Sequence, residues 1–136
     1  MLLDGLLAQY RADSGGPARL QVTGTPRALP PDAALAAFRT AQEAISNTRK
    51  HAPHAAVTVD LAYQDDAATL TITDTPPANG APVTPAIPAA EPPLAGTGGG
   101  YGLTGLRERA ELLGGTLRAG PDGTAWTVRL RLPVPP

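Results

Sequence analysis

Two segments in the first half of the chain repeat apolar residues at helical spacing. Residues 2–10 carry four leucines and a tyrosine on one stripe, which predicts a short amphipathic helix whose apolar side needs a partner surface. A longer helix is predicted to begin at Pro31-Asp32 and to end before Pro53, because proline is favoured in the first turn of a helix and stops its continuation. The apolar side of this helix is expected to comprise Ala34, Phe38, Ala41, Ile45 and Ala52.

Alternation between apolar and polar residues predicts the strands. The expected strands cover residues 19–23, 55–63, 68–72, 116–119 and 125–132. The second and third form a hairpin around Gln64-Asp65-Asp66, and the last two form another around residues 120–123, with Trp126 and Val128 on its inward face. Together with the helices they predict an α+β fold, a two-layer α/β sandwich with a mixed, mostly antiparallel sheet of about five strands and helices on one face.

A long segment rich in proline and glycine lies between the two hairpins. From Thr75 to Leu106 there are seven prolines, seven glycines and a single charged residue, Glu91. Proline at this density excludes a membrane-spanning helix and predicts a long loop. Apolar positions from Leu103 to Leu113 then predict a helix that Gly114-Gly115 ends, because glycine is the most common residue just after a helix.

Length and charge limit the classes of function. The chain has 136 residues, enough for one domain, and its 11 basic and 12 acidic residues give a net charge of -1. This balance excludes a dedicated nucleic-acid binder and a polybasic membrane-binding surface. With no cysteine and two histidines, disulfides and the usual zinc sites are excluded, and a cytoplasmic location is expected. The N-terminus lacks signal-peptide features, and we expect a piece cut from a longer chain.

A polar stripe on the predicted long helix is the first candidate site. Glu43, Asn47 and Lys50 follow one another at steps of four and three residues, with His51 beside them, so they share one side of the helix. This stripe fits a solvent-exposed helix face. It also fits a magnesium site, because asparagine is unfavourable inside a helix, whereas Mg2+ takes an amide oxygen together with waters and substrate phosphates.

An acidic residue at the end of a predicted strand is the second candidate. Counting by twos along the strand from Ala68 places Asp74 on its apolar face. A buried carboxylate needs a donor, and the exocyclic amine of adenine would supply one. Alternatively, the strand ends at Thr73 and Asp74 caps the turn that follows. The residue pattern leaves both interpretations open.

A glycine cluster is the third candidate. The residues Gly98-Gly99-Gly100-Tyr101-Gly102 lead directly into the next predicted helix. Backbone N–H groups at a helix start bind an anion readily when no side chains interfere. The cluster therefore suits a phosphate cradle at the end of a nucleotide lid, although a flexible linker has the same composition.

Together these segments resemble the catalytic ATP-binding domain of sensor histidine kinases, in the superfamily shared with gyrase, the ninety-kilodalton heat-shock chaperone and MutL. The sequence QEAISNTRKHA at 42–52 is similar to the family's N box, and GGGYGLTGLRERAELLGG at 98–115 is similar to its second glycine box. Shorter matches at 10–15, 26–30 and 105–109 resemble the nitrate-sensor subfamily, whose members partner helix-turn-helix response regulators. The resemblance implies a Bergerat-type ATP-binding fold.

The resemblance also implies residue roles. Glu43 matches the catalytic acid-base or water-orienting residue, Asn47 the Mg2+ ligand, and Asp74 the carboxylate that binds adenine. The other nucleotide-binding positions implied in this way are Lys50, His51, Gly98, Gly100, Tyr101, Gly102, Leu103 and Gly105. The implied cofactors are ATP and Mg2+.

Domain organisation and partners follow from the same resemblance. Residues 1–12 resemble the end of the dimerisation and phosphotransfer helices, 13–136 resemble the catalytic domain, and about 76–100 correspond to its ATP lid. The implied reaction transfers the γ-phosphoryl group of ATP to a histidine upstream of this chain, so the chain alone should not autophosphorylate. The implied partners are ATP or ADP, the upstream helices and, through the parent protein, a response regulator, with no nucleic acid and no direct membrane contact by this domain.

One segment departs from the family pattern. The family's first glycine box reads Asp, then Asp or Asn, then Gly-x-Gly, whereas Asp74 is followed by Thr-Pro-Pro-Ala-Asn-Gly. Prolines remove N–H donors and fix the backbone. An alternative prediction is therefore a degenerate, non-catalytic docking module of the same fold with weak or no nucleotide binding. A protein-serine kinase of the anti-sigma type is a third, which the helical segment at 2–10 disfavours.

Overall fold

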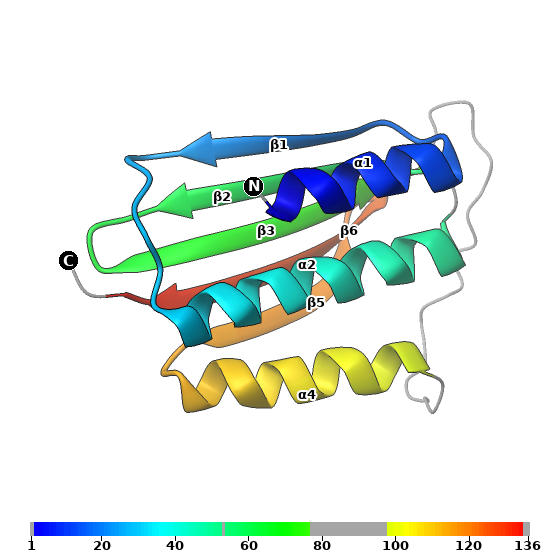
Figure 1. Ribbon diagram of the computed structural model, residues 1–136. Helices are drawn as coiled ribbons and strands as arrows, with labels where there is room; N and C mark the ends of the chain where they lie inside the picture. The colour runs from blue at the N-terminus through cyan, green and yellow to red at the C-terminus, as the bar shows by residue number, and fades with distance from the viewer. Residues whose placement is uncertain (1, 53, 77–97, 135–136) are drawn as a thin grey trace.

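The computed structural model describes residues 2–52, 54–76 and 98–134 of the chain. Its helices are α1 (Leu2–Ser14), α2 (Pro31–His51) and α4 (Gly98–Leu112), and its strands are β1 (Ala18–Thr23), β2 (Ala56–Tyr63), β3 (Ala67–Thr75), β5 (Thr116–Asp122) and β6 (Ala125–Pro133). The labelled helices all lie on one face of the sheet, and none of the described elements covers the other face (Figure 1). The α+β two-layer sandwich predicted from the sequence is confirmed.

The described strands form one five-stranded sheet in the order β1-β2-β3-β6-β5. β1 pairs with β2 in parallel, and the remaining neighbours pair antiparallel. The parallel pair results from the crossover through α2, since strands joined through a helix that packs on their sheet run in the same direction. The two predicted hairpins are β2–β3 and β5–β6, so the mixed, mostly antiparallel sheet is also confirmed.

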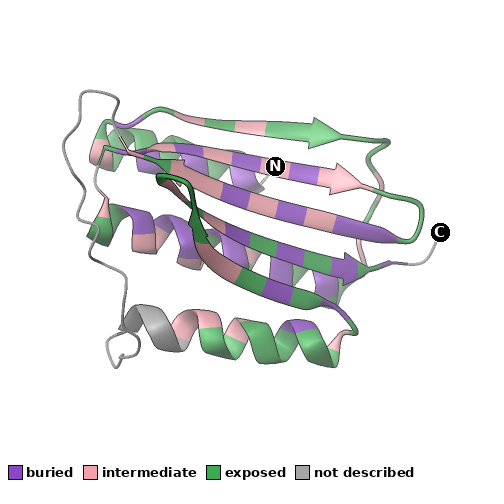
Figure 2. Cartoon of the chain, turned by 180° about the vertical axis from the view of Figure 1, so that it is seen from behind, coloured by how far each residue is buried: buried purple, intermediate pink, exposed green. Residues whose placement is uncertain are grey.

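The hydrophobic core lies between the sheet and the helix layer. Alternate residues of β2, β3 and β6 point toward the helices and are buried, and the colours along these strands alternate accordingly in Figure 2. The facing surface of α2 consists largely of alanine, whose small side chain lets the helix lie close to the sheet at normal packing density. α1 completes the core with Leu3, Leu7 and Tyr10, which are all buried.

The buried side of α2 differs from the predicted one. Its buried residues are Ala33, Ala36, Ala37, Thr40, Ala41, Ala44, Ile45 and Thr48. The prediction was wrong for Ala34, which is exposed, and Phe38 and Ala52 are only half-buried. Alanine gives little hydrophobic contrast, and the two buried threonines look polar in the sequence. The apolar pattern alone therefore selected a stripe rotated away from the buried one.

The turn between β5 and β6 lies later than predicted. β5 continues through Pro121 to Asp122, and the turn is at Gly123-Thr124, where Gly123 has a φ of 66°. β5 is at the edge of the sheet, where proline is tolerated because one side of the strand makes no ladder hydrogen bonds. The turn predicted at residues 120–123 was therefore placed too early.

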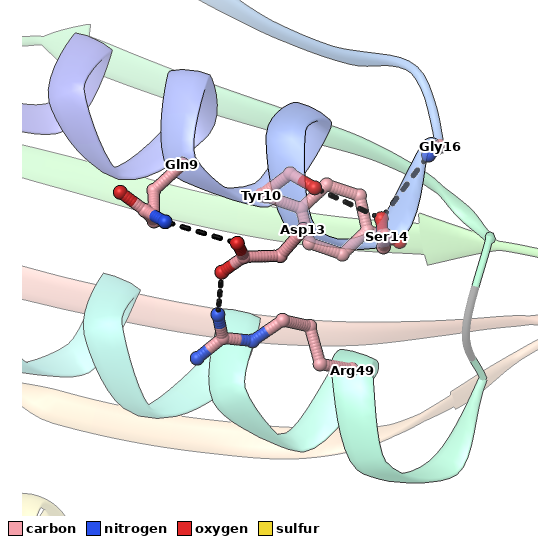
Figure 3. A network of polar contacts seen from close by, with 6 residues as sticks. All are labelled: Gln9, Tyr10, Asp13, Ser14, Gly16 and Arg49. Carbon is pink, nitrogen blue, oxygen red and sulfur yellow. Dashed lines mark hydrogen bonds and ion pairs between the residues drawn. The ribbon is translucent and has the colours of Figure 1, made fainter.

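Polar contacts, as well as buried side chains, attach α1 to the rest of the molecule. The Tyr10 hydroxyl donates a 2.6 Å hydrogen bond to the Ala55 carbonyl. Asp13 forms a 2.7 Å ion pair with Arg49 of α2 (Figure 3). α1 thus extends beyond the predicted 2–10 and packs on both α2 and β1. None of the helices in the described ranges is long and apolar enough to cross a membrane.

Candidate functional site

Asp74 lies near the end of β3 and points toward the helix layer. β3 runs to Thr75, so Asp74 is inside the strand. Its Oδ2 accepts a 2.7 Å hydrogen bond from the Thr48 hydroxyl of α2. The inward interpretation of Asp74 is therefore confirmed, and the alternative in which this residue caps a turn is wrong.

The surroundings of Asp74 disfavour its charged form. Burial raises the pKa of this carboxyl, and three weaker effects oppose the rise: a hydrogen bond from the Thr48 side chain, one from the Trp126 backbone, and the charge of His51. A desolvated carboxylate at a helix–sheet junction is a strong acceptor for a ligand donor. Perturbed groups of this kind are also more frequent at functional sites.

Asn47 precedes Thr48 on α2 and is half-buried. Its Oδ1 atom is buried and has no hydrogen-bond partner within the described residues. A buried amide oxygen without a donor is unfavourable, and a cation would satisfy it. Within the same part of the chain, no group of three or more His, Cys, Asp or Glu side chains is suited to a metal. A single amide oxygen suits Mg2+, which is held mainly by water and substrate phosphates.

Glu43 lies one turn before Asn47 on α2, about 6 Å along the helix axis, and contacts α4. A Cβ atom on Gly102 would overlap the Glu43 carboxyl group, so the absence of a side chain at position 102 allows this close approach. Burial raises the pKa of Glu43, and the charge of Lys50 opposes the rise. The fold therefore joins one residue of the N-box segment to one residue of the glycine box.

Glu43 opens onto a groove between α2 and α4 with a volume of about 610 Å³. The charged residues that line this groove are Asp32, Arg39, Glu43, Arg49 and Arg109. Gly102 and Gly105 belong to its lining, whereas Asn47 and Asp74 do not. Solvent therefore reaches Glu43 from the α2–α4 side, separately from the junction at Asp74.

Lys50 and His51 are exposed in the last turn of α2. A cation at this position stabilises a helix, because it faces the negative end of the helix dipole. The charge of His51 also acts on Asp74. These two side chains are therefore accessible to an anionic ligand while they complement the helix end.

The glycine box lies in α4, which begins at Gly98. Gly98, Gly100, Tyr101, Gly102, Leu103 and Gly105 all belong to this helix. Its first N–H groups have no acceptor within the helix itself. Leu103 packs against the hydrophobic core, and a Cβ on Gly105 would meet nothing within 4 Å. Most of the predicted lid, residues 77–97, lies outside the described residues.

Two residues of this region were not predicted as site residues. Thr48 donates a hydrogen bond to the Asp74 carboxyl. The feature of the sequence that could have indicated this role is a threonine directly after the candidate asparagine, inside a predicted helix. Trp126 lies directly opposite Asp74 in the β3–β6 register, on the inward face as predicted, and its side chain is 36% exposed. Opposite residues of an antiparallel pair share a face, but pairing between different hairpins has no signal in the sequence.

Comparisons with known proteins agree with this arrangement. A protein-family model described as histidine kinase-, DNA gyrase B-, and HSP90-like ATPase matches residues 32–136. The nitrate/nitrite sensor protein NarX of Escherichia coli K12 is 32% identical over 116 residues, which cover 85% of this chain and 17% of NarX. NarX of Shigella flexneri matches to the same extent. The chain thus spans less than a fifth of the length of these sensor proteins.

Solved structures share the fold at low sequence identity. The histidine kinase AdeS of Acinetobacter baumannii has a TM-score of 0.70 and 16% identity, and the match covers 98% of this chain and 63% of that one. The catalytic domain of the histidine kinase ThkA has a TM-score of 0.72 and 11% identity, covering 98% of this chain and 91% of that one. Because the family model extends over most of the residues, this chain belongs to the family of histidine kinase-, DNA gyrase B-, and HSP90-like ATPases.

Proposed function

We propose that this chain is the ATP- and Mg2+-binding catalytic domain of a sensor histidine kinase. The observation that carries the proposal is the junction of α2 and β3. There, Thr48 holds the inward carboxylate of Asp74, and its neighbour Asn47 has a buried amide oxygen without a partner among the described residues. The carboxylate suits the amine of adenine and the amide oxygen suits a hard cation. Membership of an ATPase family supports the same nucleotide.

In this proposal Asp74 selects adenine by accepting a hydrogen bond from the exocyclic amine. Guanine carries a carbonyl at that position, and a desolvated carboxylate facing a carbonyl oxygen is strongly unfavourable. Trp126, opposite Asp74 and 36% exposed, offers an aromatic surface on the same side of the sheet. The base is thus recognised by one polar contact and one apolar surface.

The phosphates are bound by side-chain charges at the C-terminal end of α2 and by the dipole at the N-terminal end of α4. Asn47 holds Mg2+, which neutralises phosphate charge when bound. Lys50 and His51 contribute side-chain donors from the end of α2, and the leading N–H groups of α4 from Gly98 onward contribute backbone donors. Glycine at position 102 keeps α4 close to α2, so that both helix ends serve one ligand.

Glu43 acts on the histidine that receives the phosphoryl group. The acceptor nitrogen attacks the γ-phosphorus, the nitrogen–phosphorus bond forms as the bond to the β–γ bridging oxygen breaks, and ADP leaves. Glu43 orients the imidazole and takes its proton, a role for which a raised pKa is suitable. The groove between α2 and α4 provides the approach to Glu43. Catalysis is otherwise positioning and charge neutralisation.

The parent protein supplies what this domain lacks in the proposal. Residues 1–12 are the end of its dimerisation and phosphotransfer helices, 13–136 are the catalytic domain, and the acceptor histidine lies upstream, so His51 and His54 are not acceptors. The domain works in the cytoplasm, and a response regulator takes the phosphoryl group from the parent protein. Leu3, Leu7 and Tyr10, all within residues 1–12, are buried in the core of the catalytic domain, which supports a direct mechanical link between the two parts.

Phosphotransfer between separate pieces tests the proposal. The chain is incubated with γ-labelled ATP, Mg2+ and the dimerisation segment of its parent protein. We expect label on the segment only, stable to base and labile to acid, as phosphohistidine is. Glu43→Gln should keep nucleotide binding and slow the transfer about a hundredfold or more, within the range for loss of a general base.

Three outcomes would contradict the proposal. Absence of label with a well-folded chain would favour the docking module that the prolines after Asp74 suggest. Acid-stable label would identify a serine or threonine kinase. Full transfer activity in Glu43→Gln would remove the role assigned to Glu43.

A further inference from the structure

The sheet face that points away from the helices carries a cluster of arginines. Arg118 of β5 lies directly opposite Arg129 of β6, and both are exposed. Arg131 follows two residues later on β6, on the same side. Figure 2 views the molecule from this side, where the exposed segments of β5 and β6 are adjacent. We refer to Arg118, Arg129 and Arg131 as the arginine cluster.

Hydroxyl groups and a shallow concavity accompany the arginine cluster. Thr71 and Thr69 of β3 are opposite Arg129 and Arg131 in the register. These threonines and the arginine cluster line a depression of about 460 Å³ over β3, β6 and β5. The depression therefore combines guanidinium groups with hydroxyl donors, and it lies on the opposite side of the sheet from the proposed nucleotide site.

Two of the three arginines form no ion pair with the described residues, and the outward-facing Asp60 of β2 lies two strands from Arg129 in the same cross-strand row. Arg131 has Asp66 at 3.8 Å, with both side chains at least half exposed, whereas Arg118 and Arg129 have no ion-pair partner in the described ranges. Asp122 lies four residues from Arg118 along β5, about 13 Å away in an extended strand. Like charges directly opposite in an antiparallel pair are destabilising. Because the chain has a net charge of -1, the cluster is a local feature rather than a result of overall basicity.

From this juxtaposition we propose that the outer sheet face docks an acidic, extended protein segment through its carboxylates. A guanidinium group binds a carboxylate through two parallel hydrogen bonds. The two arginines of β6 are two residues apart, a spacing of about 7 Å that matches alternate side chains of an extended peptide. Arg118 lies across from them and binds a further carboxylate, which relieves its repulsion with Arg129.

The composition of this face favours a protein partner over a nucleic acid. Proteins that bind single-stranded nucleic acids combine positive charge with aromatic side chains that stack on the bases. The aromatic residues of the chain are Tyr10, Phe38, Tyr63, Tyr101 and Trp126. Each of them lies either on a helix or on the strand face that points toward the helices. None of the exposed large hydrophobic residues in the described ranges lies on the outward face of β5 or β6. The proposed contact with the acidic segment is therefore polar.

Fluorescence anisotropy with a labelled hexaglutamate peptide tests the proposal, with hexaglutamine as the uncharged control. We expect the acidic peptide to bind and its affinity to fall as salt increases. The double substitution Arg118→Glu with Arg129→Glu should weaken binding at least tenfold. Arg19→Glu changes the same charge on the outward side of β1, outside the cluster, and should change binding less than twofold.

A single substitution separates docking from general surface charge. Arg118→Glu places a carboxylate opposite Arg129, so it should raise the thermal midpoint of the free protein while it lowers affinity for hexaglutamate. Saturating ATP should leave peptide affinity unchanged, because the nucleotide site lies on the other side of the sheet. This expectation does not depend on whether the nucleotide proposal is correct.

Four results would overturn the docking proposal. The first is equal affinity for hexaglutamate and hexaglutamine, and the second is an equal loss of binding in Arg19→Glu and in the double variant. The third is displacement of the peptide by ATP. The fourth is that a labelled oligonucleotide of the same charge binds more tightly than the peptide. The last result would assign the arginine cluster to a nucleic acid instead.

Discussion

The contact between Glu43 and Gly102 makes a prediction that compares two glycines of one helix. Alanine is favoured over glycine inside a helix by about 1 kcal/mol. At Gly105 a Cβ would meet nothing within 4 Å, so Gly105→Ala should raise the free energy of unfolding by most of that amount. At Gly102 a Cβ would overlap the Glu43 carboxyl. Gly102→Ala should therefore gain less stability than Gly105→Ala, because the flexible Glu43 side chain must turn away from α4 into the groove.

Removing the Glu43 side chain should restore the full gain in stability expected for Gly102→Ala. In the Glu43→Ala background, Gly102→Ala should stabilise the protein as much as Gly105→Ala does, which gives a coupling energy between positions 43 and 102 of at most about 1 kcal/mol. In the Glu43→Gln background the coupling should remain, since glutamine occupies the same volume. Urea denaturation measures these differences, and each 1 kcal/mol corresponds to about 4 °C in Tm for a domain of this size.

One result would contradict the contact between Glu43 and α4. If Gly102→Ala and Gly105→Ala stabilise the protein equally, with Glu43 present and with alanine in its place, then Glu43 does not lie against α4. The joining of the N-box helix to the glycine-box helix would then be wrong, and with it the groove from which Glu43 is approached.

Further predictions follow from the junction and from α1. Because the pKa of Asp74 is raised in the folded state, its contribution to stability is fully present below the unfolded value of 3.8 and is lost as pH rises through the folded value. Urea denaturation should therefore show that Asp74→Asn has a higher free energy of unfolding than wild type at pH 7, and that this difference shrinks toward pH 4. Calorimetry should show that the variant no longer binds ATP. A difference in unfolding free energy that does not change with pH would contradict the raised pKa of Asp74. Tyr10→Phe removes the hydrogen bond to the Ala55 carbonyl and should cost about 1–2 kcal/mol in the same assay; an unchanged midpoint would count against that bond. Trp126 is the only tryptophan, so ATP should change its fluorescence and GTP should not; equal responses would remove it from the adenine site.

Strand pairing within hairpins could be predicted because alternation has a fixed period. Counting from Ala68 placed Asp74 on the inward face, and its hydrogen bond to Thr48 confirms this. The turn at 64–66 lies between two strongly alternating segments, so the register of β2 and β3 follows from it. These features depend only on residues close in sequence.

Contacts between distant elements could not be predicted. The buried side of α2 was misjudged because alanine-rich helices have several faces of similar hydrophobicity. The pairs Glu43–Gly102 and Asp74–Trp126 depend on how α4 and β6 are placed relative to α2 and β3. No periodicity within one element encodes that placement.

Calorimetric titration of the chain with ATP, with and without Mg2+, is the most direct test of nucleotide and metal binding at the junction of α2 and β3. We expect wild type to bind ATP, Mg2+ to strengthen this binding, and Asn47→Ala to retain only the part of the affinity that is independent of Mg2+. A control substitution at Arg19, which is exposed on the edge strand β1, should leave both titrations unchanged. An absence of binding by wild type, or an equal effect of Mg2+ on wild type and Asn47→Ala, would contradict the account.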